Sequence, residues 1–186
     1  MVLKTRTSLA EYLALPTTKP WLELMDGEVF EKPMVNRNHS RLTSRLIHWL
    51  IAHLDESGEG VVDTELRHGY LEEEWVFLPD ISVTLKGRLP YPPADTPKGP
   101  FEVLPDFAIE VVSPDDLPGR LQRRIAHYMR SGVRLLWVVD PEAEKVTVWE
   151  PGATPMDYSA PAILAAAPVL PDFELDLGRL FSYLHE

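Results

Sequence analysis

The sequence predicts an α/β fold in which a mixed central sheet is flanked by helices. Two amphipathic helices are expected at residues 39–57 and 116–131, and apolar strand-like runs lie between and after them. The run 107–112, the second helix and the run 135–140 follow one another with short links, which indicates a βαβ unit with parallel strands. Hairpins expected elsewhere add antiparallel strands, so the sheet is mixed.

The composition is that of a globular protein. The chain has 186 residues, of which 45 % are hydrophobic and 25 % charged, and we expect a single domain over residues 1–186. The absence of cysteine excludes disulfides, thiolate zinc sites, iron–sulfur clusters and cysteine nucleophiles. No stretch approaches the roughly 20 apolar residues that span a bilayer. We therefore expect a soluble, cytoplasmic protein with no membrane partner.

The charge balance bears on nucleic-acid binding. Eighteen Lys and Arg residues face 29 Asp and Glu residues, a formal net charge of −11, which argues against broad nonspecific binding to phosphates. Local basic clusters remain compatible with this total. Two helical rows of arginine are candidate phosphate contacts, although a solvated helix face is the commoner meaning of such a row. The rows are Arg37, Arg41 and Arg45, and Arg120, Arg123 and Arg130.

The N-terminal elements have clear local signals. Ser8 and Glu11 form a capping box that predicts a short helix at 9–14, which ends before Pro16. Residues 21–33 predict a hairpin, because Asp26-Gly27 suits a type I′ turn. Glu23 lies on the incoming strand, on the face that Trp21 and Met25 share by alternation.

The first long helix and the strands after it follow from periodicity. Asn38 is the predicted N-cap of helix 39–57, Gly58 ends it, and His39 falls at the edge of its inward stripe. The runs 61–71 and 75–85 predict two strands around a turn at 72–74 and, with the hairpin, a meander. The face of helix 39–57 opposite its apolar stripe carries arginines, including Arg41.

The remaining segments complete the expected fold. Residues 86–104 hold five prolines and two glycines and predict a long loop of a kind that is often functional. In helix 116–131, Arg120, Arg123, His127 and Arg130 lie opposite the apolar face, and Gly132 ends the helix. A last hairpin strand at 145–150, a Pro/Ala-rich stretch at 151–168 and a helix at about 177–185 finish the chain.

Glu110 is the most informative residue. It lies inside the apolar run 107–112, which is typical of a central strand covered on both faces. A carboxylate there is costly unless it is paired or binds a metal. A structural, salt-bridged glutamate is the alternative interpretation.

Asp80 is the second candidate acid. It follows Pro79 in another apolar strand, and if that strand neighbours the strand of Glu110, the two carboxylates converge on one hard cation. This would be a phosphodiesterase arrangement. Alternatively, Asp80 is a turn or strand-start aspartate. Asp106 lies four residues before Glu110, about 13 Å along a strand, and is interpreted as a cap.

Three further residues extend the candidate site. Arg124 projects about 60° from the centre of its helix's apolar face and can lean toward the strand of Glu110, where it would stabilise negative charge on a phosphate. It can equally extend along apolar surface. Glu23 is a candidate third carboxylate, and His39 can approach the same cleft, although a lone histidine is more often a packed core residue.

Taken in order, these motifs resemble the putative restriction endonuclease family of bacteria, part of the PD-(D/E)XK nuclease superfamily. The resemblance covers about residues 8–150, and the block from Pro105 to Pro141 is its most specific part. The segments that carry it are Glu23 to Glu28, His39, Pro79-Asp80, Pro105 to Pro114, Tyr128 with Gly132-Val133, and Trp137 to Pro141.

The resemblance implies a restriction-endonuclease-like fold and a metal-dependent DNA endonuclease. Asp80 and Glu110 would bind Mg²⁺ or Mn²⁺, with Glu23 as the upstream acid and His39 as an accessory residue. The superfamily's lysine normally lies two positions after the acid, which is Val112 here. In this family a basic residue four before the tyrosine replaces it, and here that residue is Arg124, which stays charged but accepts a proton poorly. A homodimer is implied by analogy, since two sites cut two strands.

Two alternatives remain open at this point. A catalytically silent module of the same fold, binding nucleic acid or a partner protein, is favoured by Arg124 and by the acidic total. A glycosidase that uses a pair of carboxylates is chemically feasible, but the small domain offers no aromatic-rich cleft. A requirement for a divalent ion at Asp80 and Glu110 separates the nuclease from both.

Overall fold

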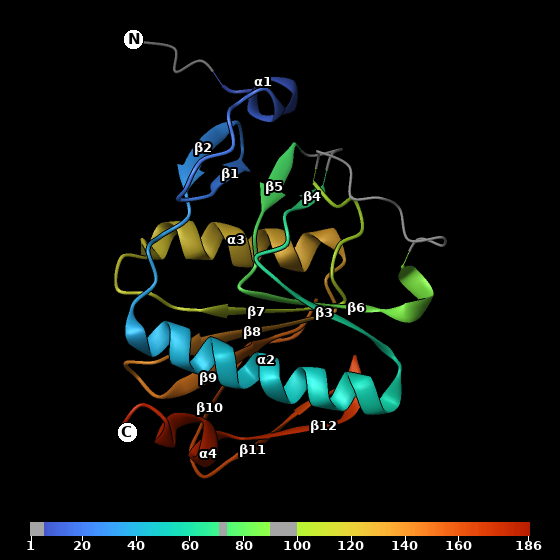
Figure 1. Ribbon diagram of the computed structural model, residues 1–186, viewed down its shortest axis with the longest axis vertical. Coiled ribbons are helices and arrows are strands. Elements are labelled where there is room, and N and C mark those ends of the chain that lie inside the picture. Colours follow the sequence, from blue (N-terminus) through green and yellow to red (C-terminus); the bar gives the residue numbers. More distant parts are fainter. Residues whose placement is uncertain (1–5, 71–73, 90–99) are drawn as a thin grey trace.

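A computed structural model describes residues 6–70, 74–89 and 100–186 and contains a six-stranded central sheet in the order β10-β9-β8-β7-β6-β3. Only β7 and β8 are parallel, so the sheet is mixed, and helices α2 and α3 lie on its two faces (Figure 1). The predicted fold class is confirmed. The strands are β3 (Gly60–Thr64), β6 (Ile81–Leu85), β7 (Phe107–Val111), β8 (Leu135–Asp140), β9 (Lys145–Trp149) and β10 (Met156–Ser159); the helices are α2 (Arg37–Ser57) and α3 (Pro118–Ser131).

A second, four-stranded sheet lies on the far side of α3 in the order β2-β1-β5-β4 (Figure 1). It comprises the predicted hairpin, β1 (Leu22–Met25) and β2 (Glu28–Glu31), with β4 (His68–Tyr70) and β5 (Trp75–Phe77), and α1 (Leu9–Leu13) precedes it. The single meander that the sequence predicted is wrong. The run 61–71 breaks at Glu65, which has a positive φ of 48°, and the run 75–85 breaks at Pro79. Each run therefore contributes one strand to each sheet.

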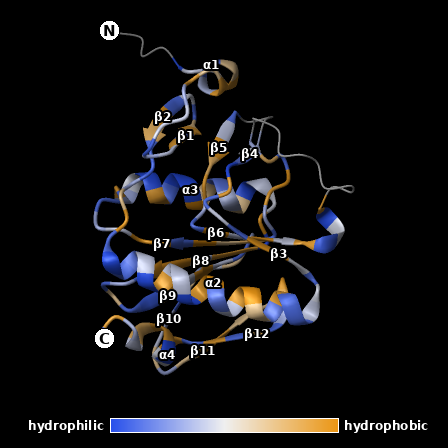
Figure 2. Ribbon diagram, in the orientation of Figure 1, coloured by the Kyte–Doolittle hydropathy of each residue, from blue (hydrophilic) through white to orange (hydrophobic). Residues whose placement is uncertain are grey.

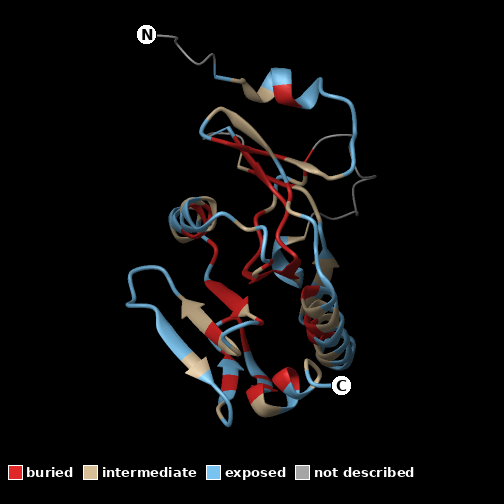
Figure 3. Ribbon diagram, turned by 90° about the vertical axis from the view of Figure 1, so that its left-hand side faces the viewer, coloured by how far each residue is buried: buried red, intermediate tan, exposed pale blue. Residues whose placement is uncertain are grey.

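Helix α2 packs on the lower face of the central sheet through leucines four residues apart. Leu42, Leu46 and Leu50 are fully buried against strand residues that include Ile109 and Trp137. Figure 3 shows these buried residues, in red, on the central strands and on the inner side of the helix. Gly58 ends the helix in the left-handed region as predicted, but the N-cap is Asn36, two residues before the predicted Asn38. The Asn36 side chain accepts from the backbone of His39.

Helix α3 is largely hydrophilic although it lies between the two sheets (Figure 2). Its apolar side, with Ile125 and Tyr128, packs on Ala108 and neighbouring strand residues. The sequence placed His127 opposite this side, but its ring is buried and stacks on Trp75 with centroids 4.0 Å apart. The second sheet packs on this side of α3. The periodicity of the helix sequence alone cannot reveal burial by another segment.

The C-terminal segment differs most from the prediction. Residues 151–168, for which the sequence predicted no strand, contain β10 and β11 (Ile163–Ala166), and β11 pairs with β12 (Leu170–Asp176) before α4 (Leu177–Ser182). Pro151, Pro155, Pro161 and Pro168 all fall outside these strands. The prolines therefore separate four-residue strands, because a proline cannot donate a hydrogen bond within a ladder.

Two predicted loops lie wholly or partly outside the described residues. These are the turn at 72–74, of which 72 and 73 are not described, and the loop 86–104, of which 90–99 are not described. In the part of the chain that is described, no helix is long and apolar enough to cross a lipid bilayer.

Candidate active site

Asp80 and Glu110 lie next to each other where β6 begins: Asp80 directly precedes β6, and Glu110 is on the adjacent antiparallel strand β7. Strands β6 and β7 pair with Ile81 opposite Ile109, and one further step in this register sets Asp80 opposite Glu110. The Asp80 Oδ2 atom accepts a 2.8 Å hydrogen bond from the backbone of Val111, next to Glu110. Both side chains are buried and line one cavity of about 10 Å³. The predicted neighbourhood of the two acids is therefore present.

Asp80 is bound by two basic side chains. Lys32 Nζ lies 2.8 Å from Asp80 Oδ1, and His39 Nε2 lies 3.0 Å from Oδ2. With Nε2–H donating to Asp80, His39 Nδ1 can accept from Thr43, whose hydroxyl is 3.4 Å away. Burial by itself would raise the pKa of Asp80, but the Lys32 charge and His39 outweigh it and hold this pKa well below its usual range.

Lys32 is the site residue that the sequence did not reveal. It follows β2, is only 5 % exposed, and also donates a 2.8 Å hydrogen bond to the carbonyl of Leu78. Burial alone would lower its pKa, yet the charges of Asp80 and Glu110 raise it, so the ammonium remains charged. A lysine between Glu31 and Pro33 at the end of a hairpin has no distinguishing pattern, because most lysines are exposed.

Glu110 is enclosed by different groups. Its Oε1 accepts a 2.5 Å hydrogen bond from the Tyr128 hydroxyl, and its Oε2 lies 3.4 Å from Arg124 Nη1. Burial raises the pKa of Glu110 to about 7; the Arg124 charge opposes this shift and the Asp80 charge adds to it. Both acids are thus buried side by side, but one is held ionised and the other is close to protonation at neutral pH.

Arg124 does lean toward the strand of Glu110, as the helical repeat predicted. It is 3 % exposed and lies about 3.4–3.5 Å from carboxylate oxygens of Glu23, Glu110 and Asp116. Burial acts to lower its pKa, and the Glu110 and Glu23 charges raise it further than burial lowers it. A guanidinium surrounded in this way is held in one place, with its charge shared among three acids.

Glu23 lies behind this arrangement, on β1. It is fully buried, and its Oε1 accepts a 2.9 Å hydrogen bond from the backbone of Leu78 and lies 3.5 Å from Arg124. Its Oε2 has no hydrogen-bond partner among the described residues. Because Leu78 is two residues before Asp80, Glu23 connects Arg124 on α3 to the segment that leads to Asp80.

The donor set fits a hard divalent cation with few protein ligands. Among the described residues, no three His, Cys, Asp or Glu side chains are grouped to hold a metal. Mg²⁺, however, is commonly held by one or two carboxylates together with waters and substrate phosphates. Four carboxylates, Glu23, Asp80, Glu110 and Asp116, face only two fixed cations, Lys32 and Arg124, so the acids outnumber the fixed cations. Asp80 and Glu110 would hold the ion.

Other candidates from the sequence lie elsewhere or have partners within the chain. Asp106 accepts from the backbone of Leu85, at the end of β6, and pairs with Arg88, so it lies outside the site but does not cap a helix. Four arginines of the two rows contact the protein itself: Arg41 donates to the Tyr183 carbonyl, Arg45 lies over the Tyr183 ring, Arg120 donates to the Glu31 carbonyl, and Arg123 binds Asp26 and Glu28. These arginines connect helices α2 and α3 to α4 and to the hairpin.

A buried pair of acids with adjacent cations, at two inner strands of a mixed sheet flanked by helices, is an arrangement suited to a nuclease. A family model described as "Putative restriction endonuclease" (Uma2) matches residues 9–178, and the chain belongs to this family. The chain is also similar to a solved structure described as a putative nuclease belonging to DUF820, from Anabaena variabilis. That similarity amounts to 27 % identity over 95 % of this chain and 98 % of the other, with a TM-score of 0.85. No curated protein matches the chain.

Proposed function

We propose that this protein is a divalent-metal-dependent endonuclease of the PD-(D/E)XK type that hydrolyses phosphodiester bonds in DNA. The observation that carries the proposal is the facing pair of Asp80 and Glu110 at one small cavity, with the Lys32 ammonium on the same carboxylate. Asp80 and Glu110 would hold Mg²⁺ or Mn²⁺. Such an ion, when bound, neutralises phosphate charge and lowers the pKa of bound water.

The surrounding side chains fix the two acids in place. The Val111 N–H and His39 orient the Asp80 carboxylate, while Tyr128 and Arg124 orient that of Glu110. Ligand groups held in this way need little rearrangement when an ion binds. In this proposal His39, Arg124 and Glu23 are positioning residues, and Glu23 acts at the greatest distance, through Leu78 and Arg124.

Lys32, rather than Arg124, takes the role of the superfamily's lysine in this proposal. An ammonium has three N–H donors, and two of them are used, toward Asp80 and the Leu78 carbonyl. The third can donate to a phosphate oxygen or to the attacking water, and the fixed charge stabilises the negative charge that develops on phosphorus oxygens. Arg124 is committed to three carboxylates and is less available.

The test is DNA cleavage with Mg²⁺, with Mn²⁺ and with EDTA, on single-stranded and double-stranded DNA. We expect metal-dependent cleavage by the wild type and a loss of about 100-fold or more in Asp80→Asn and Glu110→Gln, the scale typical of removing a group that stabilises the transition state. Asp106→Asn is the matched control, since Asp106 is an equally buried carboxylate outside the site. Equal activity in all four proteins would overturn the proposal.

One contact favours the alternative of a catalytically silent module. The Lys32 ammonium lies 2.8 Å from Asp80 Oδ1, at an edge of the carboxylate that a metal ion would also need. If lysine permanently replaces the ion, the chain would bind nucleic acid or protein without cutting. No cleavage on any DNA, together with no heat of Mn²⁺ binding, would establish this alternative.

A further inference from the structure

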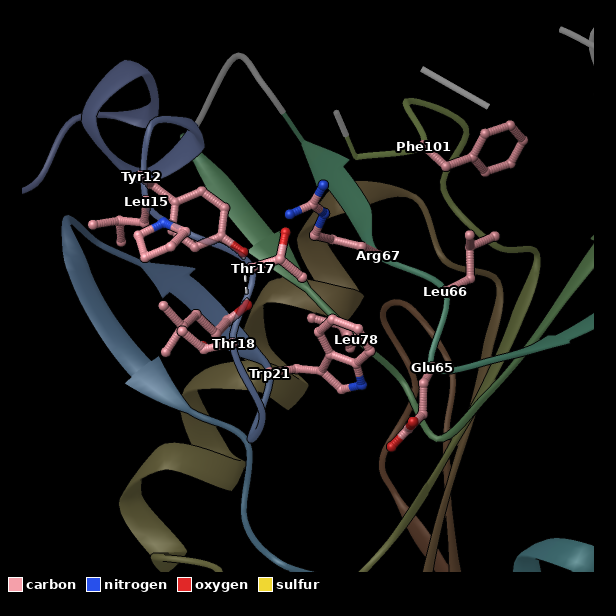
Figure 4. Close-up of a pocket in the computed structure, with 12 residues that line it drawn as sticks. Tyr12, Leu15, Thr17, Thr18, Trp21, Glu65, Leu66, Arg67, Leu78 and Phe101 are labelled. Atoms are coloured by element: carbon pink, nitrogen blue, oxygen red, sulfur yellow. Dashed lines mark hydrogen bonds between the residues drawn. The ribbon is translucent and has the colours of Figure 1, made fainter. Parts of the chain in front are cut away.

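A second cavity of about 250 Å³ lies beside the candidate active site, on the side of the N-terminal helix α1. Figure 4 shows the Tyr12 and Trp21 rings around it, with Arg67 and Thr17 between them, Glu65 at one end and Phe101 at the rim. Its wall therefore combines flat apolar rings with groups that donate and accept hydrogen bonds. This combination suits a planar, polar-edged ligand.

Lys32 connects this cavity to the two acids. Its Nζ donates to the carbonyl of Leu78 and lies 3.9 Å from Glu65 Oε1, and both of these residues line the cavity. The same Nζ lies 2.8 Å from Asp80 Oδ1. One ammonium group thus stands between the cavity and the place where a scissile phosphate would lie, and a molecule that fills the cavity reaches the neighbourhood of Asp80.

We propose that this cavity binds one unpaired nucleobase of a DNA strand whose neighbouring phosphate lies at Asp80 and Glu110. The proposal rests on the proposed nuclease function and deepens it by naming the form of the substrate. A base stacks on Trp21 or Tyr12, and its polar edge meets Thr17, Glu65 and Arg67. The cavity is slightly smaller than the roughly 300–1,000 Å³ of sites for drug-sized ligands, a size that suits a single base.

The charge around Trp21 also agrees with a nucleic-acid strand. Lys19 Nζ lies over the Trp21 ring, 5.3 Å from its centroid, and Lys32 binds the carbonyl of Leu78, another residue that lines the cavity. Two residues of the cavity wall are thus each contacted by a cation, and cations attract the phosphates of a nucleic-acid strand. Because a base within a duplex is paired and stacked, it must leave the helix to enter such a cavity. The preferred substrate is therefore single-stranded or locally unpaired DNA.

The experiment compares two labelled oligonucleotides of equal length in EDTA, by fluorescence anisotropy. One is all thymidine, and the other has the same backbone with abasic residues, so the number of phosphates is equal. We expect the wild type to bind the thymidine oligonucleotide about 10-fold more tightly, in keeping with stacking of one base on an aromatic ring. In Trp21→Ala this preference disappears, while affinity for the abasic strand is unchanged.

Two variants guard against a trivial result. Trp49→Ala is the matched control, because Trp49 is also half-buried and also lies under a cation, Arg179, but belongs to α2, which is on the other side of the central sheet from α1. It should keep the preference. Thr17→Phe fills the cavity from an exposed position without removing a packed side chain, and it should abolish the preference as Trp21→Ala does.

Equal affinity of the wild type for the two oligonucleotides, or an unchanged preference in Trp21→Ala and Thr17→Phe, would overturn the base-binding proposal. Neither result depends on cleavage, since EDTA prevents it. The nuclease proposal fails separately, when metal-dependent cleavage is absent or survives in Asp80→Asn and Glu110→Gln.

Discussion

The two faces of the central sheet are built from different residues. On the α2 face, leucines of the helix meet Ile81, Ile109, Trp137 and other apolar side chains in one continuous core. On the α3 face, Asp80, Glu110 and Arg124 are buried together with apolar neighbours such as Tyr128. Burying apolar area stabilises a fold, whereas burying charges costs free energy unless each is paired.

The difference indicates a division between stability and function. Removing a charge from the α3 face leaves its partners buried and unpaired, whereas removing a methyl group from the α2 face leaves only a void. Substitutions on the α2 face should therefore change stability alone, and substitutions on the α3 face should change chemistry as well. Each prediction below tests this division, beginning with the largest effect.

The largest effect on stability is expected for Arg124→Ala. The substitution leaves Glu23 and Glu110 buried with no guanidinium between them, and breaking a buried ion pair in this way costs about 3–5 kcal/mol. Urea unfolding measures the change. The neighbouring Arg123 is 36 % exposed in its pairs with Asp26 and Glu28, so Arg123→Ala should cost less than about 1 kcal/mol. Similar losses for the two arginines would contradict the account of the α3 face.

The α2 face is tested by Leu46→Ala. Leu46 is fully buried in the core, and truncation of such a leucine typically costs about 2–5 kcal/mol through lost burial and a residual void. Cleavage per folded molecule, measured well below the unfolding midpoint, should not change. Ile51→Ala, at an exposed position of the same helix, should stay within about 0.5 kcal/mol of the wild type. A selective loss of cleavage in Leu46→Ala would show that the two faces are coupled.

Lys32→Met tests chemistry on the α3 face. The substitution keeps an unbranched apolar stem and removes the ammonium that contacts Asp80. We expect cleavage to fall about 100-fold, which corresponds to about 2.7 kcal/mol in the activation free energy. Single-turnover rates at saturating Mg²⁺ measure the fall. Arg124→Lys, which keeps a charge near Glu110, should fall less; the reverse order would return the role of the superfamily's lysine to residue 124.

The smallest effect, when counted per pH unit, concerns a buried histidine that lies outside the site. The pKa of His68 is lowered to about 4 by burial, while its Nδ1–H donates to the Val103 carbonyl and its Nε2 accepts from Ser82. Below pH 6.5 the unfolded chain binds a proton that the folded chain does not, so stability falls as pH falls toward 4. One such group contributes up to about 1.4 kcal/mol per pH unit.

His68→Gln is the corresponding variant. Its unfolding free energy should decline less steeply over this range than that of the wild type, as measured by urea titration at several pH values. Parallel curves for the two proteins would contradict the buried, neutral state of His68.

The acids of the site could be predicted from the sequence because their surroundings are local. Glu110 is the one charged residue in the run 107–112, whose other residues are apolar on both faces of the strand. The pairing of β6 with β7 then brings Asp80 next to Glu110. The lean of Arg124 follows from the helical repeat in the same way. These residues are informative because their neighbours along the chain already define where their side chains lie.

Other features depend on contacts between segments far apart in the chain. Lys32 reaches Asp80 across 48 positions, and nothing next to it in sequence indicates burial. His127 is covered by Trp75, which belongs to the second sheet. The sequence pattern assigns Trp75 to a single meander instead. The strands β10, β11 and β12 were not predicted, because four-residue strands between prolines and a strand that itself contains Pro171 lack a long alternating pattern.

The central claim is that Asp80 and Glu110 together hold one divalent ion, and calorimetric titration with Mn²⁺ tests it most directly. The account predicts one binding site per chain in the wild type and in Asp106→Asn, and no measurable site in Asp80→Asn or Glu110→Gln. Unchanged Mn²⁺ binding in both site variants, with all four proteins folded, would contradict it.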